Sequence, residues 1–153
     1  CALNSNTEKH TYKSKDVEFI LNTNDPTSFT TLANKINNDK TLEIVMIQHE
    51  FGLFKSSEES LIELLKTIIK PVILAFHTVL PNPNAGLEQH VKELASLASM
   101  VTVMTKSSAE LLKNTYGLSQ EKIRVISHGT HLVKHQDKAA LKEKHNVSNR
   151  AIS

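Results

Sequence analysis

Short apolar runs alternate with amphipathic stretches along most of this chain. The runs at residues 43–48, 72–76 and 123–126 are rich in β-branched residues, and each is followed by polar residues that include a histidine. Continuous apolar runs of this length are typical of strands buried on both faces of a parallel sheet. Residues 17–21 and 100–104 are further predicted strands, and Cys1-Ala2-Leu3 has the pattern of a strand end.

The stretches between the runs repeat apolar residues at helical spacing. The predicted helical faces cover residues 29–36, 61–69 and 87–98, and a short charged helix is predicted at 138–145. The predicted N-terminal signals are Asp25 followed by proline and two capping boxes, Ser56 with Glu59 and Ser107 with Glu110. Alternating strands and helices predict an α/β domain with a mainly parallel sheet and helices on both faces.

The amino-acid composition of the chain limits the kinds of function that it can have. A formal net charge of +2, few aromatic residues and no tryptophan argue against a nucleic-acid partner. The single cysteine, Cys1, forms no internal disulfide, and no apolar run approaches the roughly 20 residues needed to span a bilayer. The chain does not begin with methionine, and residues 149–153 resemble the start of a strand. We therefore expect a fragment of a longer protein.

Three strands end on residues that carry chemistry: His49 with Glu50, then His77, then His128. The carboxyl ends of parallel strands meet at one edge of a sheet, so a shared site is expected there. No close metal-ligand motif, Gly-x-Ser-x-Gly motif or glycine-rich phosphate loop is present. Hydrogen bonding or acid–base work by the histidines is favoured over a metal site. For each histidine taken alone, a loop residue bonded to nearby backbone is the simpler interpretation.

Three motifs occur in a fixed order: Ile47-Gln48-His49-Glu50-Phe51-Gly52-Leu53-Phe54, then Lys70 to Pro81 containing Ala75-Phe76-His77-Thr78, then Lys122 to Gly129. With Ala109-Glu110-Leu111-Leu112 and Tyr116-Gly117 between the last two, the pattern resembles the N-terminal domain of family 4 (group 1) glycosyltransferases. Within that family it is most similar to the mannosyltransferase-like branch associated with polysaccharide synthesis. The resemblance covers residues 43–150 and, less specifically, the residues before them.

The resemblance implies a GT-B fold, in which two Rossmann-like domains face each other across a cleft. Residues 1–133 would be the N-terminal, acceptor-binding domain, and residues 134–153 the linker and the start of the donor-binding domain. The family's first strand, with its glycine-rich loop and helix, has no counterpart in this chain. Because that strand normally lies in the middle of the sheet, we expect a gap or an altered strand pairing.

The resemblance also implies roles for particular residues. His77 corresponds to the histidine beside the donor sugar and is the expected catalytic residue, while His49 and Glu50 correspond to the acceptor side. The remaining expected cleft residues are Phe51, Thr78, Ser127, His128 and Gly129, with Ser127 where the family usually has proline. Family members retain the anomeric configuration and use neither a metal nor a cofactor, the nucleotide sugar being the substrate.

The expected partners are that nucleotide sugar, held by the donor-binding domain, and a glycan or lipid-linked acceptor. This implies a cytoplasmic enzyme, with peripheral contact at the inner face of the membrane to which Lys134 to Lys138 could contribute. A solvated linker is the simpler interpretation of that stretch. The fragment alone is expected to be inactive. A non-catalytic α/β binding or interaction module is the main alternative, and a metal-dependent hydrolase is a further one.

Overall fold

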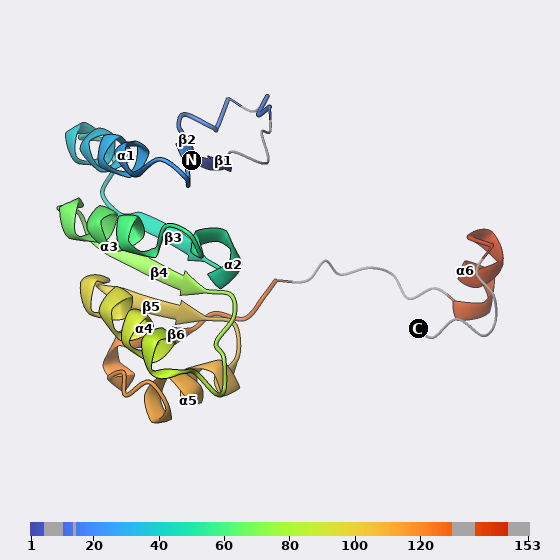
Figure 1. Cartoon of the computed structure of the whole chain (residues 1–153). Coiled ribbons are helices and arrows are strands. Elements are labelled where there is room, and N and C mark those ends of the chain that lie inside the picture. The colour runs from blue at the N-terminus through green and yellow to red at the C-terminus, as the bar shows by residue number, and fades with distance from the viewer. Residues whose placement is uncertain (5–10, 14, 130–136, 147–153) are drawn as a thin grey trace.

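The computed structural model describes residues 1–4, 11–13, 15–129 and 137–146 (Figure 1). Strands and helices alternate along the chain, which confirms the predicted α/β class. The elements are β1 (Ala2–Asn4), β2 (Ile20–Asn22), α1 (Pro26–Asn38), β3 (Val45–His49), α2 (Phe51–Phe54), α3 (Glu58–Thr67), β4 (Val72–Phe76), α4 (Ala85–Leu97), β5 (Met100–Val103), α5 (Lys106–Asn114), the 3-10 turn η1 (Gln120–Lys122), β6 (Ile123–Val125) and α6 (Lys138–Lys144).

A parallel sheet in the order β3-β4-β5-β6 forms the centre of the structure. Its register pairs Val45 with Val72 and His49 with Phe76, so β3 and β4 end side by side. Helices α1, α3 and α4 lie next to one another along one face of the molecule, and α5 packs against β5 and β6 (Figure 1). The predicted Rossmann-like arrangement of a parallel sheet flanked by helices is confirmed.

The first two strands form a separate sheet. β1 pairs with β2 in parallel, from Ala2 opposite Ile20 to Asn4 opposite Asn22, and neither strand pairs with β3. The strand predicted at 17–21 therefore begins later than expected, because the ladder with β1 extends only over residues 20–22. Within the described residues the sheet is interrupted between these two strands and β3, as the resemblance led us to expect.

The core lies between the sheet and its helices. Strands β4 and β5 are almost wholly buried, as expected for strands covered on both faces. The largest fully buried apolar side chains come from α1, α3, β4, α4 and α5 and from the loop after α5. They include Phe29, Leu61, Leu74, Phe76, Leu94, Leu112 and Tyr116. The periodicity at 61–69 predicted one residue wrongly, because the helix ends at Thr67 and the Ile69 side chain is 79% exposed.

Of the three helix starts predicted from capping residues, one is confirmed. The Asp25 side chain accepts from Thr27 N–H, so the predicted cap of α1 is confirmed. The two predicted capping boxes are wrong. α3 begins after Ser57, whose own N–H donates to the Phe54 carbonyl, and α5 begins after Thr105, whose hydroxyl accepts from Ser108 N–H.

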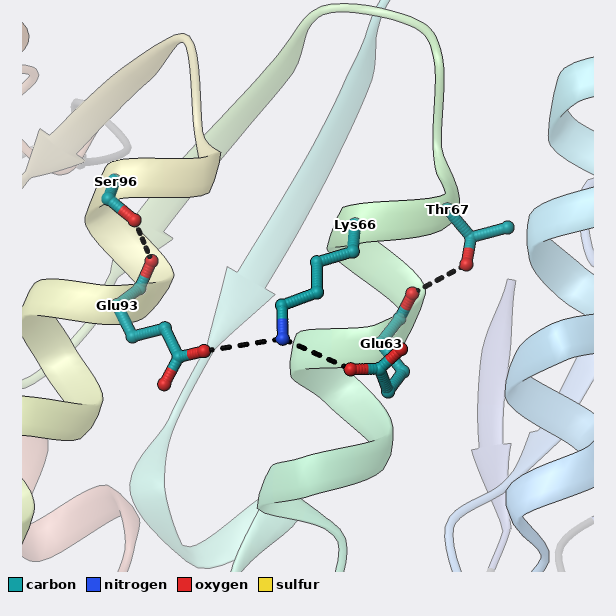
Figure 2. A network of polar contacts seen from close by, with 5 residues as sticks. All are labelled: Glu63, Lys66, Thr67, Glu93 and Ser96. Carbon is teal, nitrogen blue, oxygen red and sulfur yellow. Dashed lines mark hydrogen bonds and ion pairs between the residues drawn. The ribbon is translucent and has the colours of Figure 1, made fainter.

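Lys66 links helices α3 and α4 (Figure 2). Its ammonium lies 3.1 Å from a Glu63 carboxylate oxygen on the same helix and 3.5 Å from a Glu93 oxygen on α4. The hydrogen bond that Lys66 donates to Glu63 is the main reason why the pKa of Lys66 is raised. Burial opposes this increase, and the charge of Glu63 and the contact with Glu93 add smaller contributions that raise the pKa. All three side chains are largely open to solvent, so the network orients α3 and α4 rather than contributing much stability.

Helix α6 confirms the short charged helix predicted at 138–145, and it buries none of its residues. The linker residues 134–136 and the strand predicted at 149–153 lie outside the described residues, so the boundary between the two expected domains stays a prediction. No helix in the described part of the chain is long and apolar enough to cross a membrane.

Candidate functional site

The carboxyl ends of β3 and β4 bring two of the predicted groups together. The backbone N–H of His77 donates to the carbonyl of His49 at 3.1 Å, extending the ladder by one residue past β4. Residues 48–50 and 77–78 therefore lie beside each other at one edge of the sheet. This is the edge at which parallel α/β proteins hold their ligands.

Glu50 and Thr78 form the first polar pair of this edge. The Thr78 hydroxyl donates to Glu50 Oε2 at 2.9 Å. The other carboxylate oxygen, Oε1, accepts from the Phe51 N–H at 3.3 Å and caps the short helix α2. Both side chains are half-buried. A carboxylate offers about four lone-pair sites, so this one keeps acceptor capacity for a ligand hydroxyl.

His77 and Gln48 form the second pair. His77 Nε2 lies 2.6 Å from Gln48 Oε1, and because an amide oxygen only accepts, Nε2 is the donor in this arrangement. The other ring nitrogen, Nδ1, then accepts when the ring is neutral and donates when it is protonated. The His77 side chain is exposed, so this nitrogen can meet a ligand.

His128 approaches the same edge from the loop after β6. Its ring centroid lies 6.0 Å from that of His77, so two of the predicted histidines are neighbours. Ser127 and Gly129 flank it on the same exposed loop. The neighbouring His131 lies outside the described residues. Among the described residues, no three His, Cys, Asp or Glu side chains converge as a metal site would require.

His49 occupies a different environment. Its side chain is 1% exposed and is surrounded by aromatic rings, with centroid distances of 5.0 Å to Phe51, 5.8 Å to Phe54 and 5.0 Å to Phe76. The ring nitrogen Nδ1 is buried without a hydrogen-bond partner. The structure therefore places His49 in the core rather than with the exposed His77.

The surroundings of His49 keep its ring neutral. Burial, followed by the positive charge that His90 can carry, lowers the pKa of the imidazole from 6.5 to about 4. The nearby Glu50 carboxylate raises it, but not enough to offset burial. Phe51 belongs to the same cluster, since its ring also stacks on Phe76 at 6.3 Å.

Sequence reasoning missed Gln48 and His90. Gln48 lies next to His49 in the motif that was singled out, and alternation along a strand turns neighbouring side chains to opposite faces. That alternation was the available signal that one of the two would be exposed. His90 lies on α4, far from the strand ends in the sequence, and nothing in the sequence indicated its proximity to His49.

Comparisons of the chain with models of protein families, with curated proteins and with solved structures found no match. A functional hypothesis therefore depends on the motifs and on the geometry of the strand ends. At these strand ends the exposed His77 imidazole is held by the Gln48 amide, and the Glu50 carboxylate accepts two hydrogen bonds. A second imidazole, that of His128, lies near His77. These groups can donate to and accept from a ligand rich in hydroxyl groups.

Proposed function

We propose that this chain is the acceptor-side domain of a retaining glycosyltransferase of the mannosyltransferase-like type. The observation that supports the proposal best is the pairing of His77 with Gln48 and of Glu50 with Thr78 at the adjoining ends of β3 and β4. These are the residues that carry the sequence resemblance. Sugars present many hydroxyl groups that both donate and accept, which suits such a set of side chains.

In this proposal His77 acts on the donor sugar. Breaking a glycosyl–phosphate bond develops positive charge on the sugar ring and negative charge on the leaving phosphate. A hydrogen-bonding group that is already fixed in place orients the sugar and stabilises this separation of charge without reorganisation. Gln48 fixes the His77 ring by holding Nε2, which leaves Nδ1 for the sugar. The nucleotide sugar itself would be held by a domain outside residues 1–153.

Glu50 binds the acceptor in this proposal rather than attacking the sugar. Retaining glycosidases use two carboxyl groups about 5–5.5 Å apart, one of them as a nucleophile. Glu50 caps α2 and accepts from Thr78, which are the contacts of a fixed hydrogen-bond acceptor. His128 completes the exposed side of the site. His49 has a positioning role, because its burial holds the end of β3 against Phe76.

Calorimetric titration of the chain with a panel of mannose-containing oligosaccharides tests the proposal. Because Glu50 binds the acceptor in this proposal, Glu50→Ala should weaken binding by about tenfold, since a hydrogen bond contributes roughly 1–1.5 kcal/mol. The matched control is Glu143→Ala, which removes an exposed glutamate on α6 and should bind as the wild-type chain does. Equal affinity of all three proteins, or no binding to any saccharide, would contradict the proposal.

Saccharide binding without transfer would instead favour the alternative of a non-catalytic binding module. The two functions are separated by placing His77→Ala in a longer protein that includes a donor-binding domain. A transferase should lose turnover in this variant while its fold and its donor binding are unchanged.

A further inference from the structure

Two exposed imidazoles come together at the carboxyl edge of the main sheet. His77 follows β4 and His128 lies in the loop after β6, with β5 between these two strands in the sheet. The ring centroids are 6.0 Å apart and the ring planes are inclined at 42°, so the rings are not stacked on each other. Both side chains are open to solvent, and a small ligand can reach both rings at once.

Gln48 determines which nitrogen His77 offers to a ligand. The amide oxygen of Gln48 accepts from Nε2 of His77 at 2.6 Å, so Nδ1 carries the lone pair of the neutral ring. Histidines that bind metal ions usually donate their other ring N–H to an oxygen in the same way, which fixes the tautomer and the orientation of the ring. Within the described part of the chain, neither Nδ1 of His77 nor the ring of His128 has a hydrogen-bond partner.

The sheet fixes the backbone beside both rings. The N–H of His77 donates to the His49 carbonyl at 3.1 Å, and the N–H of Ile126 donates to the Val103 carbonyl at 2.9 Å. Each ladder therefore extends one residue past its strand, β4 in the first case and β6 in the second. Because the backbone is already held on both sides, the two rings can bind one ligand mainly by side-chain rotation, which lowers the entropic cost of binding.

We propose that His77 and His128 together bind one exchangeable divalent transition-metal ion of the Zn²⁺ type. An imidazole nitrogen binds Zn²⁺ at about 2.0–2.1 Å, which places the centroids of two rings on one ion roughly 5–6.5 Å apart, depending on the angle between the ligands. The observed separation of 6.0 Å lies within this range. Water completes the coordination, because among the described residues no third His, Cys, Asp or Glu side chain converges on the pair.

The donor atoms select the kind of ion. Imidazole nitrogens suit Zn²⁺, Cu²⁺ and Ni²⁺, whereas Mg²⁺ and Ca²⁺ prefer oxygen ligands. With two protein ligands in place of the four of a structural zinc site, the pair should release its ion readily, with a Kd of roughly 1–100 µM. The bound ion would occupy Nδ1 of His77, the nitrogen assigned to the donor sugar, and so inhibit transfer. This consequence rests on the proposed function, whereas binding of the ion does not.

Calorimetric titration of the chain with ZnCl₂ in a non-chelating buffer tests the proposal. His77→Ala and His128→Ala should each weaken binding by about tenfold or more, since each removes one of the two protein ligands. Gln48→Leu keeps both ligands but removes the acceptor for Nε2–H, and it should weaken binding by about tenfold. The matched control is His145→Ala, which removes an exposed histidine just after α6 and should bind as the wild-type chain does. MgCl₂ should produce no binding at the pair.

The NMR signals of the imidazole Cε1–H groups locate the ion. Zn²⁺ should change the signals of His77 and His128 together, with one midpoint, and leave those of the buried His49 and the exposed His145 in place. A change at only one of the first two signals would overturn the proposal, because a single histidine would then hold the ion.

Three calorimetric results would also overturn the proposal. Wild-type affinity of His77→Ala or His128→Ala would mean that other histidines of the chain hold the ion. A Kd of the wild-type chain above about 1 mM would mean that the two rings do not act together. Equal affinity of Gln48→Leu would mean that Gln48 does not position the ring. Circular dichroism checks that each variant folds, and asparagine replaces alanine at any of the histidine positions where the alanine variant does not.

Discussion

The buried histidine makes the stability of this protein depend on pH in a way that one substitution should remove. His49 is neutral in the folded chain because burial lowers the pKa of its imidazole from 6.5 to about 4. In the unfolded chain the same group regains its ordinary pKa. As the pH falls below 6.5, the unfolded state takes up the proton first and is stabilised relative to the folded state.

The size of the effect follows from the difference between the two pKa values. One pKa unit corresponds to about 1.36 kcal/mol, so the protein should lose about 3 kcal/mol of unfolding free energy between pH 6.5 and about 4. Below that range the folded state is protonated as well and the contribution of His49 levels off. This is a large part of the stability of a domain of this size, which is typically about 5–15 kcal/mol.

Urea denaturation followed by circular dichroism, at a series of pH values from about 7 to about 4.5, measures this contribution. The comparison is between the wild-type chain and His49→Leu, because other groups titrate in this range and cancel in the difference. At neutral pH the variant should be about as stable as the wild type or more so, since it no longer buries Nδ1 without a partner. On acidification it should become the more stable of the two.

The control is His145→Leu, which removes an exposed histidine just after α6 and should keep the wild-type pH dependence. Parallel stability curves for the wild type and His49→Leu over the whole range would refute the reasoning. They would mean that His49 reaches water or a hydrogen-bond partner in solution and that its pKa is close to 6.5 in both states.

Two further predictions test the core. Tyr116→Phe removes the hydroxyl that donates to the Leu80 carbonyl at 2.8 Å from a fully buried ring, so unfolding in urea should show a loss of about 1 kcal/mol. An unchanged midpoint would mean that water replaces this hydrogen bond. Leu94→Ala empties a fully buried position on α4 and should cost roughly 2–5 kcal/mol, whereas Ile69→Ala at an exposed position should change stability by less than about 0.5 kcal/mol. Equal losses for Leu94→Ala and Ile69→Ala would contradict the core as described.

Most of the fold could be predicted because the signals were local. Continuous apolar runs predicted the four strands of the main sheet, β3 to β6, to within a few residues. For β4 the predicted and observed bounds, residues 72–76, are the same. The Asp25-Pro26 start of α1 depends only on the chemistry of those two residues. The capping boxes failed at both starts: no side chain caps α3, and a different hydroxyl, that of Thr105, caps α5. The chain selects Ser57 over Ser56 and Thr105 over Ser107, which depends on how the preceding segment folds.

The candidate site was predictable only in part. The meeting of Glu50 with Thr78 and of His77 with His128 follows from parallel strands ending at one edge. The burial of His49 was not predictable from its position, because it depends on α2. This short helix folds back after β3 and places Phe51 and Phe54 against the ring. The separation of β1 and β2 from the main sheet depends on long-range packing, which local patterns do not encode.

The central claim is that the exposed strand-end histidine, and not the buried one, meets a sugar. The most direct measurement is the NMR signal of each imidazole Cε1–H during titration of the wild-type chain with a mannose oligosaccharide. The account predicts that the His77 signal moves with ligand concentration, while those of His49 in the core and His145 beyond α6 stay in place. A saturating shift at His49 with none at His77, or no shift at either, would contradict it.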